Sequence, residues 1–132
     1  MIICLRPQPD CGLDVAELTR QAVQAIALPM LQVAYLSAPQ VLFSSVGQLS
    51  SYQGIVITSK QASRYLAEHA ETSPEMRRLP VWSVGIGSAD ILRQVGFEIA
   101  YTGNGNAADL ADQIYQQGAS GPLLSLIHIS EP

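Results

Sequence analysis

Charge is scarce in this sequence, and positive charge is the scarcer sign. Seven lysine and arginine residues stand against eleven aspartate and glutamate residues, which gives a formal net charge of −4 over 132 positions. Such a chain exerts no long-range attraction on a phosphate backbone, so we expect no nucleic-acid partner. Any anionic ligand must be held by donors that lie close to it.

Cysteine and histidine are too few and too scattered to indicate metal or redox chemistry. Cys4 lies in an apolar segment, Cys11 follows a Pro-Asp turn, and neither His69 nor His128 has a partner at ligand spacing. We therefore expect no metal and no cofactor. The cysteine content and the absence of a charged-then-apolar leader favour a reduced, cytoplasmic protein.

Long apolar runs are also lacking, since none approaches the roughly 20 residues that cross a bilayer. We expect no membrane partner. Hydrophobic residues nevertheless make up 48% of the sequence, which is typical of a folded core.

Strand-like and helix-like segments alternate through the first part of the chain. The apolar run at 1–7 predicts a strand, and the helical spacing of apolar residues predicts a helix over 14–27. Asp14 and Glu17 form a capping-box pattern at the start of that helix. The segment 28–36 predicts a second strand.

The alternation restarts after Ser37–Gln40, where a proline interrupts the pattern and we place a domain boundary. Asn106 and the glycines at 96 and 118 mark helix ends. Strands are predicted at 54–59, 79–85 and 97–103, with helices at 60–71, 88–96 and 106–118. The predicted fold class is α/β with a parallel sheet.

Three strand-to-helix loops combine small hydroxyl residues, glycines and free backbone N–H groups. They are Thr58-Ser59, Val84 to Ser88, and Thr102 to Asn106. Helix starts at the carboxyl edge of a parallel sheet bind anions, so these loops predict a phosphate or polycarboxylate site. Each loop taken alone is explained by helix capping and by steric relief at the glycines, and it is the occurrence of three such loops on one edge that favours a ligand site.

The loop "VGIGSAD" is half of a dinucleotide-binding glycine motif. Gly85 and Gly87 are present, but Asp90 stands where the motif needs a small residue, and its carboxylate would repel a pyrophosphate. Ser59 and Ser88 lack a histidine partner, which argues against hydrolase chemistry. These observations leave a set of neutral donors with no evident acid or base.

The segments "LRPQPD", "YQGIVITSKQASRYLAE" and "LPVWSVGIGSADILRQVGFEIAYTGNGNAADLADQI" resemble uroporphyrinogen-III synthase in order and spacing. The resemblance covers residues 1–123 and implies flavodoxin-like domains, one of them split. On that pattern 1–36 opens the split first domain and 39–123 belongs to the second. It implies a cofactor-free, monomeric lyase that closes hydroxymethylbilane into uroporphyrinogen III through a spiro intermediate and inverts the last pyrrole ring.

The resemblance also assigns substrate-binding positions, while the catalytic residues stay unknown. Leu5 replaces a threonine of the family's opening motif, which weakens the match at that loop. The positions that match family motifs are Arg6, Thr58, Ser59, Gly85, Ser88, Gly105 and Asn106.

The sequence departs from the family pattern after about residue 123. The segment 124–132, "LSLIHISEP", resembles the translation of a sequencing adapter, so we expect a non-native tail on a truncated N-terminal half. The family's linker tyrosine and second half are then missing, and we expect no cyclisation by this chain alone. The alternative is a non-catalytic α/β module that binds an anionic metabolite or a partner; a flavin or nucleotide domain fits less well because of Asp90.

Overall fold

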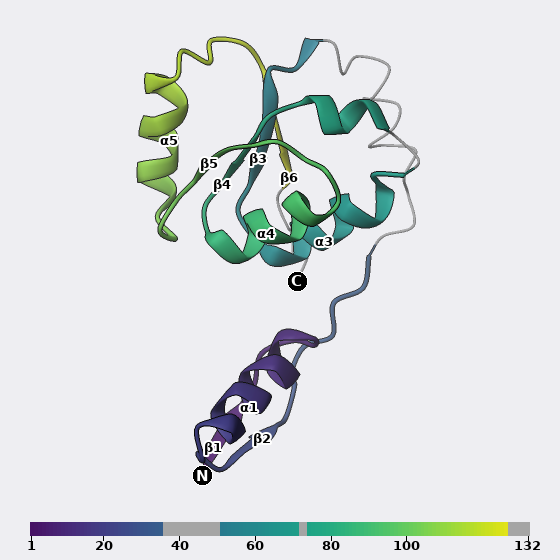
Figure 1. Cartoon of the computed structure of the whole chain (residues 1–132), viewed down its shortest axis with the longest axis vertical. Coiled ribbons are helices and arrows are strands. Elements are labelled where there is room, and N and C mark those ends of the chain that lie inside the picture. The colour runs from purple at the N-terminus through teal and green to yellow at the C-terminus, as the bar shows by residue number, and fades with distance from the viewer. Residues whose placement is uncertain (36–50, 72–73, 127–132) are drawn as a thin grey trace. The chain divides into compact units, whose positions relative to one another are not determined.

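The computed structural model describes residues 1–35, 51–71 and 74–126. Its contacts divide the chain into two units, Met1–Leu36 and Ser37–Pro132 (Figure 1). The boundary that the sequence predicts at Ser37–Gln40 lies outside the described residues.

The first unit is one helix on a two-stranded parallel sheet. Strand β1 (Ile2–Cys4) pairs with β2 (Ala25–Ala27), and α1 (Asp10–Arg20) connects them and packs on both. The apolar run at the N-terminus forms the expected strand. Cys11 is fully buried, and its thiol donates to the Cys4 carbonyl oxygen over 3.0 Å.

The predictions for 14–27 and 28–36 are wrong in their boundaries. Ala22 adopts a left-handed conformation, with φ 61°, and the Val23 amide bonds back to the Leu18 carbonyl, so the helix ends and the chain turns into β2. The described part of 28–36 is irregular, because the second strand is the earlier segment Ala25–Ala27.

The capping box at Asp14 is also wrong, because the helix begins four residues earlier at Asp10. The carboxylates of Asp14 and Glu17 form ion pairs with arginines instead. Asp14 accepts from Arg6 Nη1 at 2.7 Å, and Glu17 accepts from Arg20 Nη2 at 2.7 Å.

The second unit is a four-stranded parallel sheet in the order β5-β4-β3-β6, which confirms the α/β class. The strands are β3 (Gly54–Ile57), β4 (Val81–Ser83), β5 (Ile99–Thr102) and β6 (Leu123–Leu126). The helices among the described residues of this unit are α3 (Lys60–His69), α4 (Ile86–Gln94) and α5 (Ala107–Gln116), with a 3₁₀ turn at Pro74–Arg78.

Alternation along the strands sends side chains to both faces of this sheet. Ile55 and Ile57 join the buried core cluster together with Leu66 of α3 and Leu92 of α4, so α3 and α4 cover one face. Trp82 lies on the other face, where its indole N–H donates to Gln117 Oε1, just after α5, over 3.0 Å. Helix α5 is drawn on the side of the sheet away from α3 and α4 (Figure 1).

Strand β6 includes the first residues of the segment expected to be a non-native tail. Leu124 pairs with Ile55 and Ser125 with Val56 in regular parallel register. Residues 127–132 lie outside the described residues. The described part of that segment thus supplies an edge strand of the sheet.

Candidate functional site

The carboxyl ends of three neighbouring strands place the predicted loops on one edge of the second unit's sheet. Strands β5, β4 and β3 are adjacent and parallel, and each runs within a few residues into the start of a helix. Thr58-Ser59 follow β3, Val84-Gly85 follow β4, and Gly103 to Asn106 follow β5. All predicted site residues of this unit therefore gather at that edge.

The loop between β3 and α3 is held by a side-chain cap. Ser59 Oγ accepts from the Ala62 amide over 3.1 Å, which satisfies one of the helix's orphan donors. Thr58, one residue earlier, is exposed. Ser59 thus serves as the N-cap of α3, and the exposed hydroxyl of this loop belongs to Thr58.

The loop between β4 and α4 has no such cap. Gly85 is the N-cap residue and makes no side-chain cap bond, while its carbonyl accepts from Ser83 Oγ over 2.8 Å. The amides of Ile86, Gly87 and Ser88 occupy the first helical turn, where the helix offers no acceptor carbonyls. The α4 start is therefore the most open set of backbone donors among the three described helix starts of this edge.

Packing between α3 and α4 holds the α4 start rigidly. Ser88 is buried, and its carbonyl accepts from the buried Ser63 hydroxyl of α3 over 2.9 Å. Ser88 was predicted to bind substrate, and in the structure 6% of it is exposed. Its role visible in the structure is to bind the two helices together.

The loop between β5 and α5 is bonded to its neighbour. The Gly103 amide donates to the Ser83 carbonyl over 2.8 Å, and the Gly105 amide donates to the Val84 carbonyl over 2.7 Å. A Cβ atom on Gly103 would lie 2.9 Å from the Val84 oxygen, so only glycine allows this approach. Asn106 Oδ1 caps α5 by accepting from the Ala108 amide over 2.9 Å.

A tyrosine–carboxylate pair lies beside the third loop. The Tyr101 hydroxyl donates to Asp109 Oδ2 over 2.6 Å, from β5 to the first turn of α5. The hydrogen bond to the carboxylate, with some desolvation, raises the pKa of Tyr101 above its ordinary value. This pair was not identified from the sequence.

Arg6 belongs to the first unit, whereas the other predicted residues belong to the second. Its guanidinium lies 2.7 Å from Asp14 and 3.6 Å from Asp10. The hydrogen bond to Asp14 raises the pKa of Arg6. Within its own unit the Arg6 side chain is engaged by two carboxylates.

Lys60 lies at the same edge of the sheet, and no sequence motif singles it out. It is the first residue of α3, directly after the Thr58-Ser59 loop, and the only lysine in the 132-residue sequence. Its aliphatic chain lies on Gly87 of α4: a Cβ atom there would overlap Lys60 Cε and lie 3.2 Å from Nζ. Its position right after the loop and its uniqueness are the sequence features that could have identified it.

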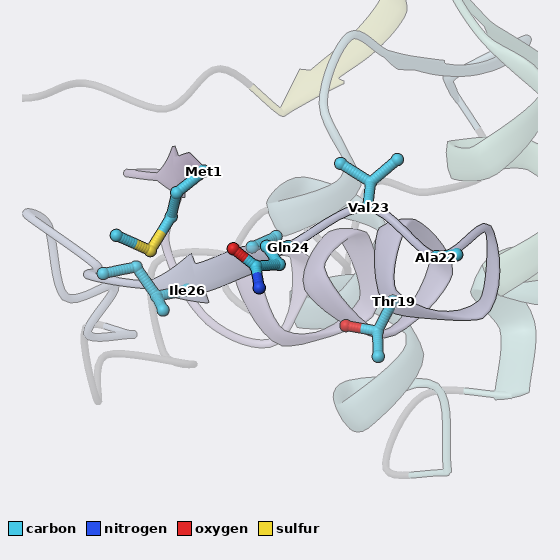
Figure 2. A pocket seen from close by; sticks show the side chains of 7 residues that line it. Met1, Thr19, Ala22, Val23, Gln24 and Ile26 are labelled. Atoms are coloured by element: carbon cyan, nitrogen blue, oxygen red, sulfur yellow. The ribbon is translucent and has the colours of Figure 1, made fainter.

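A separate hollow of about 510 Å³ lies in the first unit, lined by Met1, Thr19 and residues 22–26 (Figure 2). It carries no charged side chain and none of the predicted site residues, so we assign it no anion site. In the part of the chain that the structure describes, no group of His, Cys, Asp and Glu could hold a metal ion. No described helix is long and apolar enough to cross a membrane.

The edge at the ends of β3, β4 and β5 can hold carboxylates or phosphates through amides and hydroxyls. A comparison with protein families agrees with the sequence resemblance. The family model for uroporphyrinogen-III synthase HemD matches residues 14–127, which is most of the chain.

Proposed function

Because the chain belongs to the uroporphyrinogen-III synthase family, we propose that its second unit holds the carboxylates of a linear tetrapyrrole during closure to uroporphyrinogen III. The substrate would be hydroxymethylbilane, whose side chains end in acetate and propionate groups. The ligand-binding set of this unit would be Thr58, Ser59, Gly85, Ser88, Gly105 and Asn106. In the first unit, Arg6 would be a residue that binds a carboxylate.

The reaction depends more on how the substrate is positioned than on strong acids or bases. Protonation of the terminal hydroxyl and its loss as water leave an azafulvene cation on the tetrapyrrole. The pyrrole ring of the tetrapyrrole itself stabilises this cation. The last ring is then attacked at its substituted carbon to form a spiro intermediate, which opens and recloses with that ring inverted before a proton is lost. Holding the carboxylates fixes which carbon reaches the cation, and such positioning is a large part of catalysis in intramolecular reactions.

One observation carries the proposal: three adjacent parallel strands deliver their helix starts to a single edge. The first-turn amides of α4 and the Thr58 hydroxyl supply donors without excess positive charge. Ser59 and Asn106 support this role indirectly, because they cap α3 and α5 and so fix the loops. A ligand with many carboxylates suits several donor groups spread along one edge.

A negative charge introduced by substitution at the start of α4 tests the proposal. The backbone at Gly85 is extended, with φ −143°, and nothing lies within 4 Å of a Cβ atom there. Aspartate therefore fits and is a favourable N-cap. We expect Gly85→Asp to fold normally and to bind uroporphyrin III, the stable oxidised product, at least about tenfold more weakly than wild type.

Gln94→Glu is the matched control, since it adds the same charge at the exposed last residue of the same helix. We expect its affinity for uroporphyrin III to stay within about twofold of wild type. Fluorescence titration of the porphyrin measures both. Equal affinities of wild type and Gly85→Asp would place the ligand elsewhere and refute the proposal.

A cyclisation assay addresses the reaction itself. We expect the 132-residue chain to bind the tetrapyrrole without producing isomer III above the isomer I that forms spontaneously. The donors at this edge supply binding, whereas protonation of the leaving hydroxyl needs an acid that the sequence does not identify. Isomer III in excess of the uncatalysed reaction would show that the chain holds the complete machinery.

A further inference from the structure

We propose that Cys4 and Cys11 form a thiol–disulfide site in the first unit, where a hydroperoxide oxidises the two thiols to a bond between β1 and α1. A thiol reductant would reverse the reaction. The inference goes beyond tetrapyrrole binding and does not depend on it. The two cysteines stand seven positions apart with no redox motif around them, so the sequence alone does not indicate the site.

The fold brings the two thiols together between the strand and the helix. Cys4 is the last residue of β1 and Cys11 is the second residue of α1, and these elements pack on each other. The Cys11 thiol donates to the Cys4 carbonyl oxygen over 3.0 Å. Burial, together with a hydrogen bond to the Cys4 thiol, raises the pKa of the Cys11 thiol above its ordinary value. The two thiols are therefore in contact in the reduced protein.

The exposure of the two cysteines sets the order in which they react. Cys4 is half-buried, whereas Cys11 is 0% exposed. A peroxide can reach the Cys4 sulfur from solvent, and the Cys11 sulfur needs to reach only Cys4. A buried thiol is inert toward solvent, but it can react with an oxidised sulfur that it already contacts. Cys4 is thus the first nucleophile, and Cys11 is the thiol that completes the disulfide.

Two charged side chains lie beside the Cys4 sulfur. The Cys4 thiol donates to Asp14 Oδ2 over 3.8 Å. Asp14 is paired with Arg6 at 2.7 Å, and Arg6 also interacts electrostatically with Cys4. A carboxylate alone disfavours a neighbouring thiolate, whereas a guanidinium favours it. Arg6 therefore offsets the charge of Asp14 at the sulfur that reacts first.

The oxidation balances with one hydroperoxide molecule, ROOH. The Cys4 thiolate attacks one peroxide oxygen, the O–O bond breaks, and the leaving alkoxide takes a proton to become ROH. The Cys11 sulfur then attacks the sulfenic acid on Cys4: the S–S bond forms, the S–O bond breaks, and hydroxide leaves as water with the Cys11 proton. Two electrons pass from the sulfurs to the peroxide oxygens. A dithiol reverses the reaction through a mixed disulfide and is itself oxidised.

The disulfide would close a ring from Cys4 to Cys11 that contains Arg6. It would fasten the start of α1 to the end of β1 in a unit where apolar residues such as Ile3 remain 53% exposed. A cross-link of this kind lowers the conformational entropy of the open state. We expect amide exchange in β1 and α1 to slow by about tenfold or more on oxidation.

Oxidation of the full 132-residue chain by hydrogen peroxide tests the site. The sequence contains no other cysteine, so an internal disulfide can join only these two residues. We expect one equivalent of peroxide to remove both free thiols and to lower the intact mass by two hydrogen atoms. A gel without reductant should show no covalent dimer. Dithiothreitol should restore both thiols.

Two variants test the order of reaction. Cys11→Ser keeps a hydroxyl that can donate to the Cys4 carbonyl oxygen, as the thiol does. We expect its oxidation to stop at the sulfenic acid, which dimedone traps on Cys4. Cys4→Ser leaves only the buried thiol, and we expect it to react with peroxide at least about tenfold more slowly than Cys11→Ser. Equal rates for the two variants would refute the assigned roles.

Arg6→Gln tests the charge beside the sulfur, because it leaves the Asp14 carboxylate without its cation. We expect the oxidation of Cys4 to slow by about threefold to tenfold. Arg20→Gln is the matched control, since it breaks a 2.7 Å ion pair with Glu17 at the other end of the same helix. Its oxidation rate should match wild type. Equal rates for the two variants would show that Arg6 does not act on Cys4.

Closeness along the chain can also join two cysteines, so the equilibrium is compared with that of the protein unfolded in urea. In a glutathione buffer we expect the disulfide to be favoured at least about tenfold more in the folded chain. An equal or smaller equilibrium constant in the folded chain would show that the fold does not build the site and would overturn the inference. Both thiols surviving peroxide treatment, or a covalent dimer in place of the internal bond, would overturn it as well.

Discussion

The hydrogen bond from Tyr101 to Asp109 gives Tyr101 a different pKa in the folded protein from that in the unfolded chain. The pKa of Tyr101 is raised in the folded state, chiefly because its hydroxyl donates a hydrogen bond to the Asp109 carboxylate. A group with a raised folded-state pKa stabilises the protein fully below its unfolded pKa, here about 10, and loses that contribution as the pH rises through the folded value. The pair therefore stabilises the second unit at neutral pH.

We expect Tyr101→Phe to lower the free energy of unfolding at neutral pH, because Asp109 loses its donor. The difference from wild type should shrink as the pH rises above about 10. Urea unfolding followed through Trp82 at several pH values measures it. Tyr115→Phe is the control, since that ring is 84% exposed and should leave the pH dependence unchanged. A wild-type advantage that stays constant across this range would contradict the assignment.

At the scale of elements, the contact between β3 and β4 depends on a glycine. A Cβ atom on Gly54 would overlap the Trp82 ring and lie 2.7 Å from the Pro80 carbonyl oxygen. Neither the backbone oxygen nor the buried ring can move away freely. We expect Gly54→Ala to destabilise the second unit by about 1–3 kcal/mol.

Gly85→Ala is the comparison for that substitution, because its Cβ meets nothing within 4 Å and its backbone is extended. We expect a loss within about 1 kcal/mol, caused by the poorer N-cap. Denaturant unfolding followed by the fluorescence of Trp82, the only tryptophan, measures both. Equal midpoints for the two variants would show that the sheet relaxes around the extra methyl.

The helices of the second unit were predictable because their end markers are local. Asn106 caps α5, and the glycines at 96 and 118 adopt the left-handed conformations expected after α4 and α5. In the first unit α1 ends at Arg20 and the chain turns at Ala22, an alanine with positive φ, which no sequence rule marks. The apolar residues that follow continue the helical spacing although the chain has already turned into β2.

Some features of the candidate site could likewise be predicted from local sequence, whereas others depend on tertiary packing. Loops at the ends of buried strands can be placed on one edge from the alternation alone, because adjacent parallel strands end together. The contact of Lys60 with Gly87 depends on how α3 packs on α4, which no local pattern encodes. The burial of Ser88 against α3 likewise comes from packing and could not be read from its position in the motif.

At the scale of the molecule, burial is distributed unequally between the two units. The core cluster lies entirely in the second unit and includes Ile55, Leu66 and Leu92. In the first unit the sheet has only two strands, and Ile3 remains 53% exposed. We expect so small a unit to bury too little apolar surface to be very stable on its own.

We therefore expect hydrogen exchange to separate the units. Amides of β3 and β4 should exchange only through global unfolding, whereas those of β1 and β2 should exchange orders of magnitude faster through local opening. Peptide-resolved exchange at two protein concentrations measures this. Slow exchange in β1 and β2 that persists on dilution would contradict the expectation. Protection that appears only at high concentration would mean that the exposed apolar residues of the first unit are covered by a second copy.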